Sequence, residues 1–164
     1  MTTDPTRILF ICMGNICRSP TAEVVFHAQV RAAGLEQLFA VDSAGTTDWH
    51  QGEPPDSRSV LAAADRLYDM SNLRARQITD LDFEDFDHIY AMDQINLEAL
   101  QDLCPLQYQH KLELLLTYGH TGWREVPDPY NSGLEGFELV LDLTETACCA
   151  LLAELQQKYP SGKA

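Results

Sequence analysis

The chain has 164 residues, of which 45% are hydrophobic and 22% are charged. This length and composition indicate one globular domain and exclude a disordered chain. The formal net charge of −14 would repel nucleic acid phosphates and anionic lipids, so we expect neither as a partner. An anionic substrate would therefore need a locally positive pocket.

The first seven residues, MTTDPTR, carry an acid and a proline where a secretion signal would be basic and then apolar. The longest apolar runs are too short to span a bilayer. We therefore expect a cytoplasmic protein without membrane insertion. The odd number of cysteines, 5, argues against a disulfide framework, and no Cys/His spacing resembles a zinc site, so no metal is expected.

Short apolar runs predict four strands, which alternate with helices along the chain. The strands are expected at residues 7–12, 39–43, 88–92 and 111–116. The first helix is expected to begin with Ser19 as its N-cap and Pro20 as its first residue, and to end at Gly34. Further helices are expected at residues 56–68 and 94–103. Strands that alternate with helices predict a parallel sheet with helices on both faces.

The last helix has the clearest pattern. Apolar or small side chains recur every three or four residues at Phe137, Val140, Leu141, Thr144, Ala147, Cys148, Leu151, Leu152 and Leu155. This spacing predicts an amphipathic helix packed on the sheet. Residues 158–164 are expected to fray, and the acidic run at residues 80–87 is expected to form a solvated helix face.

The connection after the first strand, CMGNICRS, holds the residues best suited to chemistry. Gly14 and Asn15 tolerate a left-handed backbone, so the loop can curl until its N–H groups converge on one anion. That field favours a thiolate at Cys12, Ser19 can donate to the sulfur, and Arg18 can hold two anion oxygens. A thiolate in a phosphate cradle is suited to attack on phosphorus, whereas a lone core thiol would lack these neighbours.

The run ILFICMGNICRSPTAE resembles the phosphate loop of the low-molecular-weight protein tyrosine phosphatases. Further segments resemble that family in the same order: Asp42–Thr46, Asp56–Arg58, Ala75–Thr79, Phe86–Asp93 and Pro127–Tyr130. The resemblance covers nearly the whole chain. It implies an α/β fold with a single domain over residues 1–164, a four-stranded parallel sheet, and a phosphate-binding loop after the first strand. It also implies hydrolysis of phosphotyrosine without metal or other cofactor.

The resemblance gives each site residue a role. Cys12 would be the nucleophile and Arg18 the phosphate clamp. Asp128, which Pro129 favours in an extended conformation, would protonate the leaving phenolate and then activate water. Asp93 is expected to cap the helix that follows it. The loop residues expected to bind phosphate are Met13, Gly14, Asn15, Ile16, Cys17 and Arg18.

Other residues are expected around this centre. Trp49 and Tyr130 would be the aromatic walls of the substrate cleft, and such walls favour aryl over alkyl phosphates. By the same resemblance, Asn15, Ser19 and Ser43 would hold the loop curled.

Two cases remain open at this point. Cys17 either pairs reversibly with oxidised Cys12, as the resemblance implies, or is a small packing residue of the loop. Family members often carry a histidine, linked to Asn15 and Glu23, where this chain has Asn72. Asparagine cannot become cationic, so we expect the rigidity or pH dependence of the loop to differ here without loss of activity.

Other functions of the same fold fit less well. An arsenate reductase would need relay cysteines, but residues 70–103 contain none and Cys148 lies on a packed helix. A non-catalytic phosphotyrosine-binding module would have lost Cys12, Arg18 or Asp128, and all three are present. A dinucleotide-binding domain would show a glycine-rich fingerprint, which is absent. We expect a monomer, with weak self-association at most, that acts on tyrosine-phosphorylated proteins.

Overall fold

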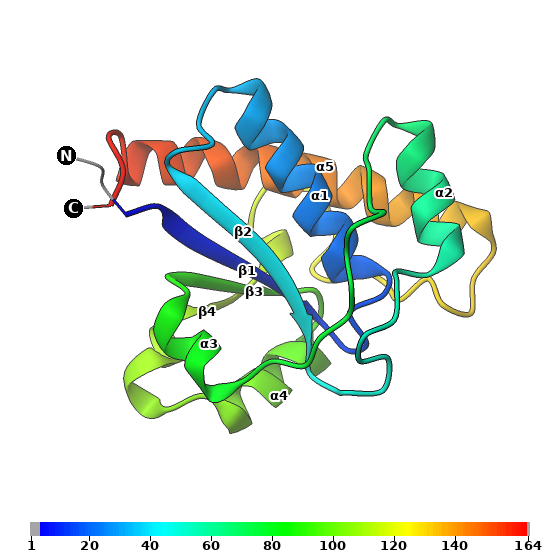
Figure 1. Ribbon diagram of the computed structural model, residues 1–164, viewed down its shortest axis with the longest axis horizontal. Helices are drawn as coiled ribbons and strands as arrows, with labels where there is room; N and C mark the ends of the chain where they lie inside the picture. The colour runs from blue at the N-terminus through cyan, green and yellow to red at the C-terminus, as the bar shows by residue number, and fades with distance from the viewer. Residues whose placement is uncertain (1–3, 164) are drawn as a thin grey trace.

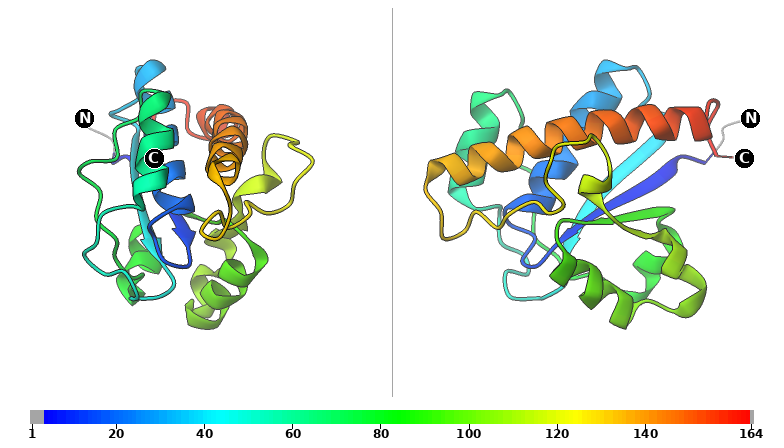
Figure 2. Two further views of the ribbon diagram at one scale, coloured as in Figure 1. Left: turned by 90° about the vertical axis from the view of Figure 1, so that its right-hand side faces the viewer. Right: turned by 180° about the vertical axis from the view of Figure 1, so that it is seen from behind.

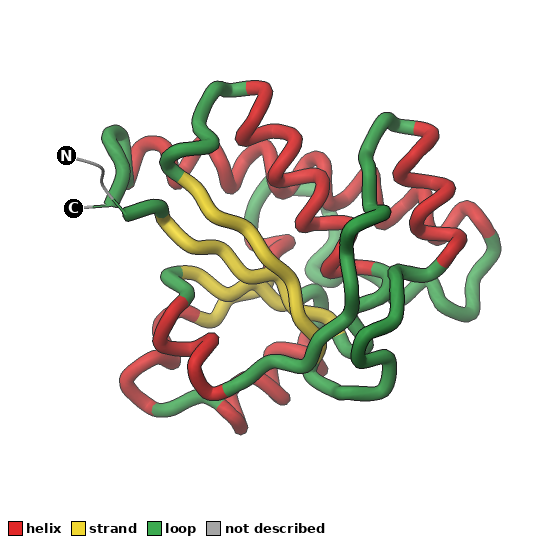
Figure 3. The backbone as a smooth tube through the Cα atoms, in the orientation of Figure 1, coloured by secondary structure: helices red, strands yellow, loops and turns green. Residues whose placement is uncertain are grey.

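The structure is a computed structural model that describes residues 4–163. Its centre is a sheet of four parallel strands, β1 (Thr6–Cys12), β2 (Phe39–Gly45), β3 (His88–Ala91) and β4 (Leu112–Leu114). The strands lie in the order β2-β1-β3-β4 (Figure 1; Figure 3). The predicted four-stranded parallel sheet is confirmed.

Helices cover both faces of this sheet. α1 (Arg18–Ala32) and α5 (Leu134–Lys158) pack on one face, and α3 (Asp80–Asp85) and α4 (Gln94–Leu103) lie on the other (Figure 2). α2 (Ser57–Asp65) packs against α5. Side chains alternate along β1, so Ile8 and Phe10 join the core under α1 and α5, while Leu9 and Ile11 join the opposite core.

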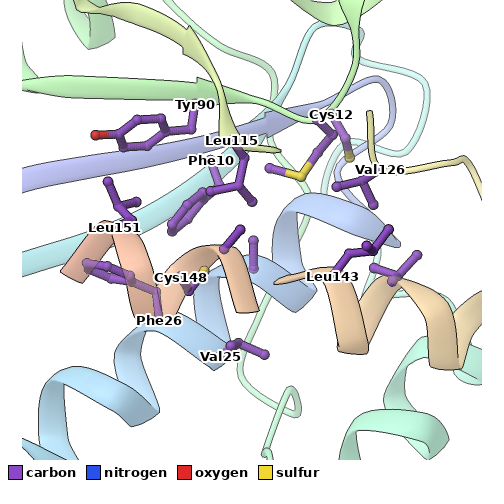
Figure 4. Close-up of a cluster of buried hydrophobic side chains, with 14 of the residues drawn as sticks. Phe10, Cys12, Val25, Phe26, Tyr90, Leu115, Val126, Leu143, Cys148 and Leu151 are labelled. Atoms are coloured by element: carbon purple, nitrogen blue, oxygen red, sulfur yellow. The ribbon is translucent and has the colours of Figure 1, made fainter. Parts of the chain in front are cut away.

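The larger core lies between the sheet and the helix pair α1 and α5 (Figure 4). The rings of Phe10 and Phe26 meet edge-on, with centroids 5.7 Å apart. Fully burying one such side chain contributes about 2–3 kcal/mol. All residues of the predicted apolar stripe on α5 are buried, which confirms the predicted face of that helix.

Strand order determines where a site can form. β1 lies between β2 and β3, so the chain crosses over β1 on its way from one neighbour to the other. Cys12 pairs with Gly45 of β2, and Ile11 pairs with Ala91 of β3. The carboxyl ends of these strands therefore meet at one edge of the sheet, where such folds bind ligands.

The start of α1 differs from the prediction. Cys17 is the N-cap and Arg18 the first helical residue, so the prediction of Ser19 as N-cap is wrong. The Ser19 hydroxyl contacts Cys12 Sγ and the Asn15 side chain instead of a free backbone N–H of the helix. The prediction of Pro20 as the first helical residue is also wrong, since it is the third residue of α1, but it still lies in the first turn, where its missing N–H leaves no hydrogen bond unmade.

Two other elements are shorter than predicted. β4 is limited to Leu112–Leu114, because 3-10 turns at Leu106–Lys111 and Leu115–Thr117 flank it. An apolar run does not distinguish a strand from such a turn. α2 ends at Asp65, and Leu67 has a left-handed φ of 68° that no helix continues through.

The acidic run is not simply a solvated face, because Asp82 is buried. Its carboxylate accepts from the Arg76 guanidinium at 2.9 Å and from the Thr79 backbone N–H at 2.7 Å. A buried charge requires such partners, and Arg76 lies outside the pattern that predicted exposure.

The end of the chain also differs from the expected frayed tail. The Tyr159 hydroxyl lies 3.0 Å from His88 Nε2, and Lys163 pairs with Asp87 at 3.2 Å. The last residue, Ala164, lies outside the described residues. Within residues 4–163, no helix has the length and apolar character needed to cross a membrane.

Candidate active site

A cleft opens at the carboxyl edge of the sheet, beside the loop that joins β1 to α1. Its walls come from this loop, from the segment after β2 and from the loop before α5. The lining residues are Cys12, Met13, Gly14, Ile16, Cys17, Arg18, Trp49, His50, Asp128, Tyr130 and Asn131. The fold thus brings Asp128, from a distant part of the chain, to the loop that carries Cys12 and Arg18.

Cys12 ends β1 and is only 3% exposed. Its Sγ lies 3.0 Å from the Ser19 hydroxyl and accepts from the backbone N–H of Asn15 at 3.3 Å. Groups that donate to an ionised sulfur stabilise its charged form. The sulfur of Cys12 thus has two hydrogen-bonding neighbours where it borders the cleft.

Asn15 gives the loop its shape. Its φ is 57°, a left-handed conformation that asparagine tolerates better than most residues. Its side-chain amide donates to Ser19 Oγ at 2.9 Å and to Ser43 Oγ at 3.0 Å, and its carbonyl accepts from the Arg76 N–H at 3.0 Å. Asn15 thus joins the loop to β2 and to the segment before α3 from behind the cleft.

Behind Asn15 the hydrogen bonds continue to the half-buried carboxyl group of Glu23. The Ser43 hydroxyl donates to Glu23 Oε1 at 2.6 Å. Burial raises the pKa of Glu23 to about 7. Asn72 is exposed in a turn, and the described side-chain partner of Glu23 is Ser43. The link that the family resemblance suggested for position 72 is therefore not formed by this asparagine.

Two glycines allow close packing around the loop. Gly14 has no positive φ, so the expected left-handed backbone occurs at Asn15 alone of the two. A Cβ at Gly14 would lie 2.9 Å from His50 Cδ2, so a side chain there would require the His50 ring to shift. A Cβ at Gly45 would lie 2.7 Å from the Met13 carbonyl oxygen, so β2 approaches the loop only without one.

Arg18 is buried and its guanidinium is held from two sides. One terminal nitrogen contacts Asp93 Oδ2 at 2.5 Å and donates to the Val126 carbonyl at 2.9 Å. The other terminal nitrogen lies 3.8 Å from Asp128 Oδ2. A guanidinium fixed in this way is oriented for planar contact with an oxyanion.

Asp93 makes two side-chain contacts, of which the sequence predicted only one. Its Oδ1 accepts from the Asn96 N–H at 2.7 Å, which confirms the predicted helix cap. Its Oδ2 holds Arg18, a contact that the sequence analysis missed. The position of Asp93 directly after β3 indicated that it lies at the carboxyl edge of the sheet. Its pairing with Arg18 could not be predicted, because Arg18 belongs to α1, a distant element of the chain.

Asp128 and Tyr130 belong to the loop before α5. The Asp128 side chain is about half exposed, and its Oδ1 accepts from the Tyr130 N–H at 3.1 Å. Trp49 is 69% exposed and Tyr130 50%, and both line the cleft. Exposed aromatic rings at the wall of a cleft offer an apolar surface to a flat ligand.

Cys17 also lines the cleft, but its surroundings differ from those of Cys12. It is 5% exposed, and burial raises its thiol pKa to about 12. Cys17 therefore remains a protonated thiol at neutral pH.

Comparison with known proteins identifies the family. A family model described as low molecular weight phosphotyrosine protein phosphatase matches residues 7–161. The chain belongs to this family. It is 42% identical to a low molecular weight protein-tyrosine-phosphatase of Streptomyces coelicolor, over 93% of this chain and 94% of that protein.

Solved structures agree on the fold. A crystal structure of a protein tyrosine phosphatase from Entamoeba histolytica, with Hepes in its active site, superposes with a TM-score of 0.90 at 39% identity. It covers 93% of this chain and 97% of that one. A structure described as a Drosophila arginine phosphatase is also similar, with a TM-score of 0.85 and 32% identity over 91% of this chain and 97% of that one. The fold therefore serves hydrolases described with more than one phosphoryl substrate.

Sequence reasoning missed two lining residues of this phosphatase. His50 lies against Gly14, and its Nδ1 is 2.8 Å from Glu53 Oε2. Asn131 follows Tyr130 in the loop before α5. No pattern of residue spacing predicts either position, because their place in the cleft depends on the tertiary arrangement of the segment after β2 and the loop before α5. Among residues 4–163, no cluster of three or more His, Cys, Asp or Glu side chains could hold a metal ion.

Proposed function

We propose that this chain hydrolyses phosphotyrosine in proteins, and small aryl phosphates, through a cysteinyl-phosphate intermediate. One observation carries the proposal: Cys12 Sγ borders a cleft that Arg18 and Asp128 also line. The nucleophile, the phosphate clamp and the proton donor are thus within reach of one phosphoryl group.

In the first step the Cys12 thiolate attacks phosphorus. An S–P bond forms while the P–O bond to the phenol breaks, and the protonated form of Asp128 gives its proton to the leaving oxygen. Arg18 and the loop N–H groups stabilise the charge on the non-bridging oxygens. The Ser19 hydroxyl, 3.0 Å from Sγ, stabilises the thiolate as nucleophile and later as leaving group.

In the second step water attacks the phosphorus of the intermediate. Asp128, now a carboxylate, accepts a proton from that water while the S–P bond breaks. Inorganic phosphate leaves and the Cys12 thiolate and the protonated Asp128 are restored. The half-exposed position of Asp128 supports this role, since a water molecule can reach it.

The walls of the cleft support an aromatic substrate. Trp49 and Tyr130 offer rings to a phenyl group, whereas phosphoarginine carries its phosphoryl group on a flexible aliphatic side chain without an aromatic ring. We therefore propose phosphotyrosine as the substrate class and phosphoarginine as the competing one. The ratio of kcat/KM for a phosphotyrosine and a phosphoarginine peptide decides between them.

The test of catalysis is hydrolysis of an aryl phosphate in EDTA by the wild type, Cys12→Ser and Asp128→Asn. We expect turnover in the wild type, none in Cys12→Ser, and a kcat reduced about 10²- to 10⁴-fold in Asp128→Asn. Absence of turnover in freshly reduced wild type would contradict the proposal, and arsenate reduction and phosphopeptide binding would then be tested.

We also propose that Cys17 is the redox partner of Cys12. Both thiols line the same cleft, so a sulfenic acid at Cys12 can condense with the Cys17 thiol: the S–S bond forms, the S–O bond breaks, and the Cys17 proton leaves with the hydroxyl as water. After peroxide treatment, reductant should restore the activity of the wild type but not of Cys17→Ser. Equal recovery of both proteins would contradict this pairing.

A further inference from the structure

Arg58 joins three parts of the molecule around the cleft without lining it. It is the second residue of α2, and its guanidinium lies over two aromatic rings, 4.7 Å from the Phe137 centroid and 5.4 Å from the Tyr130 centroid. Tyr130 lines the cleft and Arg58 does not. The guanidinium therefore contacts the Tyr130 ring from outside the cleft.

The position of the guanidinium is fixed by Asp56. Arg58 Nε donates to Asp56 Oδ1 at 3.0 Å, and a terminal nitrogen donates to Oδ2 at 2.8 Å. Two parallel hydrogen bonds set the plane of a guanidinium as well as its distance. The Asp56 carboxylate is itself largely buried, with its side chain 11% exposed.

Asp56 is tied directly to the phosphate loop. Its backbone N–H donates to the Ile16 carbonyl at 2.8 Å, and its side chain caps α2 through the Arg58 N–H at 2.9 Å. A continuous set of contacts thus runs from the loop through Asp56 and Arg58 to the Tyr130 ring. The described ring contact of Tyr130 is with this guanidinium.

We propose that Arg58 is the positioning residue for Tyr130 and so a determinant of aryl specificity. The inference rests on the proposed function, because it concerns the ring of the substrate. Tyr130 lies on an exposed loop, and a free ring would lose rotational freedom each time it packs against a ligand. The fixed cation holds the Tyr130 ring in place before a ligand arrives. The entropy cost of ordering the ring is therefore met when the protein folds and does not reduce the affinity for the ligand.

The two walls of the cleft differ in this respect. Tyr130 is 50% exposed with a cation against its ring, while Trp49 is 69% exposed and has no such contact among residues 4–163. Loss of Arg58 should therefore weaken the contribution of one wall only. Binding of the phosphoryl group by the loop should not change.

The test compares two probes that use different parts of the site. Inorganic phosphate engages the loop alone, whereas benzylphosphonate also places a ring between the walls. We expect Arg58→Met to weaken benzylphosphonate binding about three- to tenfold, with phosphate binding unchanged within about twofold. Arg58→Lys keeps the positive charge but cannot form the two parallel hydrogen bonds to Asp56. It should therefore weaken benzylphosphonate binding nearly as much as Arg58→Met.

Two controls separate positioning from folding. Arg66 also belongs to the α2 region and pairs with Glu138 and Glu145 of α5, away from the cleft, so Arg66→Met should leave both probes unaffected. In a Tyr130→Ala background, Arg58→Met should cause no further loss. Calorimetric titration gives both dissociation constants, and thermal melting checks that each variant is folded.

Results that differ from these expectations contradict either the role of Arg58 or the proposed function. Equal weakening of both probes, no weakening of benzylphosphonate, or the same loss with and without the Tyr130 ring would overturn the role of Arg58. Failure of the wild type to bind either probe would overturn the proposed function, and this inference with it.

Discussion

Two buried cysteines of the same core have opposite surroundings. Cys12 is 3% exposed and Cys148 is 0% exposed, and both belong to the cluster drawn in Figure 4. Cys12 has a hydroxyl and a backbone N–H at its sulfur. Cys148 lies on the apolar stripe of α5, and burial raises its thiol pKa. Burial is nearly equal, so the neighbours decide which sulfur can react.

The same contrast holds for the two regions as a whole. In the phosphate-loop network, defined as Asn15, Ser19, Ser43 and Glu23, three buried polar side chains and the half-buried Glu23 are joined by hydrogen bonds. In the core under α5 almost every contact is apolar. A buried polar network fixes geometry, while an apolar core contributes most of the stability. Substitutions in the two regions should therefore affect different measurements.

The largest expected effect separates the two cysteines. Cys12→Ser should reduce kcat by roughly 10³-fold or more with little loss of stability. Cys148→Ser should keep activity within about twofold but lower the free energy of unfolding by about 1–2 kcal/mol, because a hydroxyl enters an apolar site. Aryl phosphate turnover and urea unfolding of both variants test this. A stability loss in Cys12→Ser as large as in Cys148→Ser would contradict the contrast.

Two buried asparagines test whether partners matter more than burial. Asn15 is 3% exposed and its amide is fully hydrogen bonded, whereas Asn96 is 1% exposed and neither amide atom has a partner within residues 4–163. Asn15→Ala should lower the free energy of unfolding by about 2–4 kcal/mol, from lost hydrogen bonds and the left-handed φ.

Asn96→Ala is the matched control and should cost less, about 1 kcal/mol or under. Only Asn15→Ala should also reduce kcat, since only Asn15 shapes the loop. Urea unfolding and aryl phosphate kinetics of both variants check the prediction. Equal costs for the two asparagines would show that burial, not bonding, controls the effect.

A third effect concerns pH in the phosphate-loop network. The pKa of Glu23 is raised by burial from 4.5 to about 7. Its protonated form is therefore favoured in the folded state, and its contribution to stability is present below about pH 4.5 and lost as the pH rises through about 7. Glu23→Gln should become more stable than the wild type across this window, by about 2–3 kcal/mol at its upper end. Denaturant unfolding at several pH values measures the difference, and parallel curves would contradict it.

The smallest effect has the opposite sign and lies outside that network. The pKa of His88 is lowered to about 4, first by burial and then by the charge of Lys158. Its neutral form is favoured in the folded state, so the contribution is present above about pH 6.5 and lost as the pH falls through about 4. His88→Gln should be less sensitive to acid by about 1–2 kcal/mol. Acid unfolding monitored by circular dichroism tests this, and an unchanged acid transition would refute it.

Much of this molecule follows from local sequence pattern. Periodicity identified the buried face of α5, because packing imposes a fixed repeat on side chains, and short apolar runs identified the strands β1, β2 and β3. Residue type and order placed Cys12 and Arg18 in one short loop. The weakest predictions were at ends of elements, such as Ser19 and β4, where the curl of the loop around Cys12 and the 3-10 turns beside β4 decide the outcome without leaving a repeat in the sequence.

The sequence by itself therefore determined the fold class, the family and the loop that carries Cys12 and Arg18, since these depend on neighbours along the chain. Tertiary structure alone decided that Asp93 holds Arg18, that Asp82 is buried beside Arg76, and that Arg58 lies against the ring of Tyr130. The Arg18–Asp93 and Arg58–Tyr130 contacts join side chains far apart in the chain, and Arg76 meets the nearby Asp82 only because the segment before α3 folds back on that helix. No local repeat records such a pairing, because its geometry exists only once the sheet and its helices have assembled.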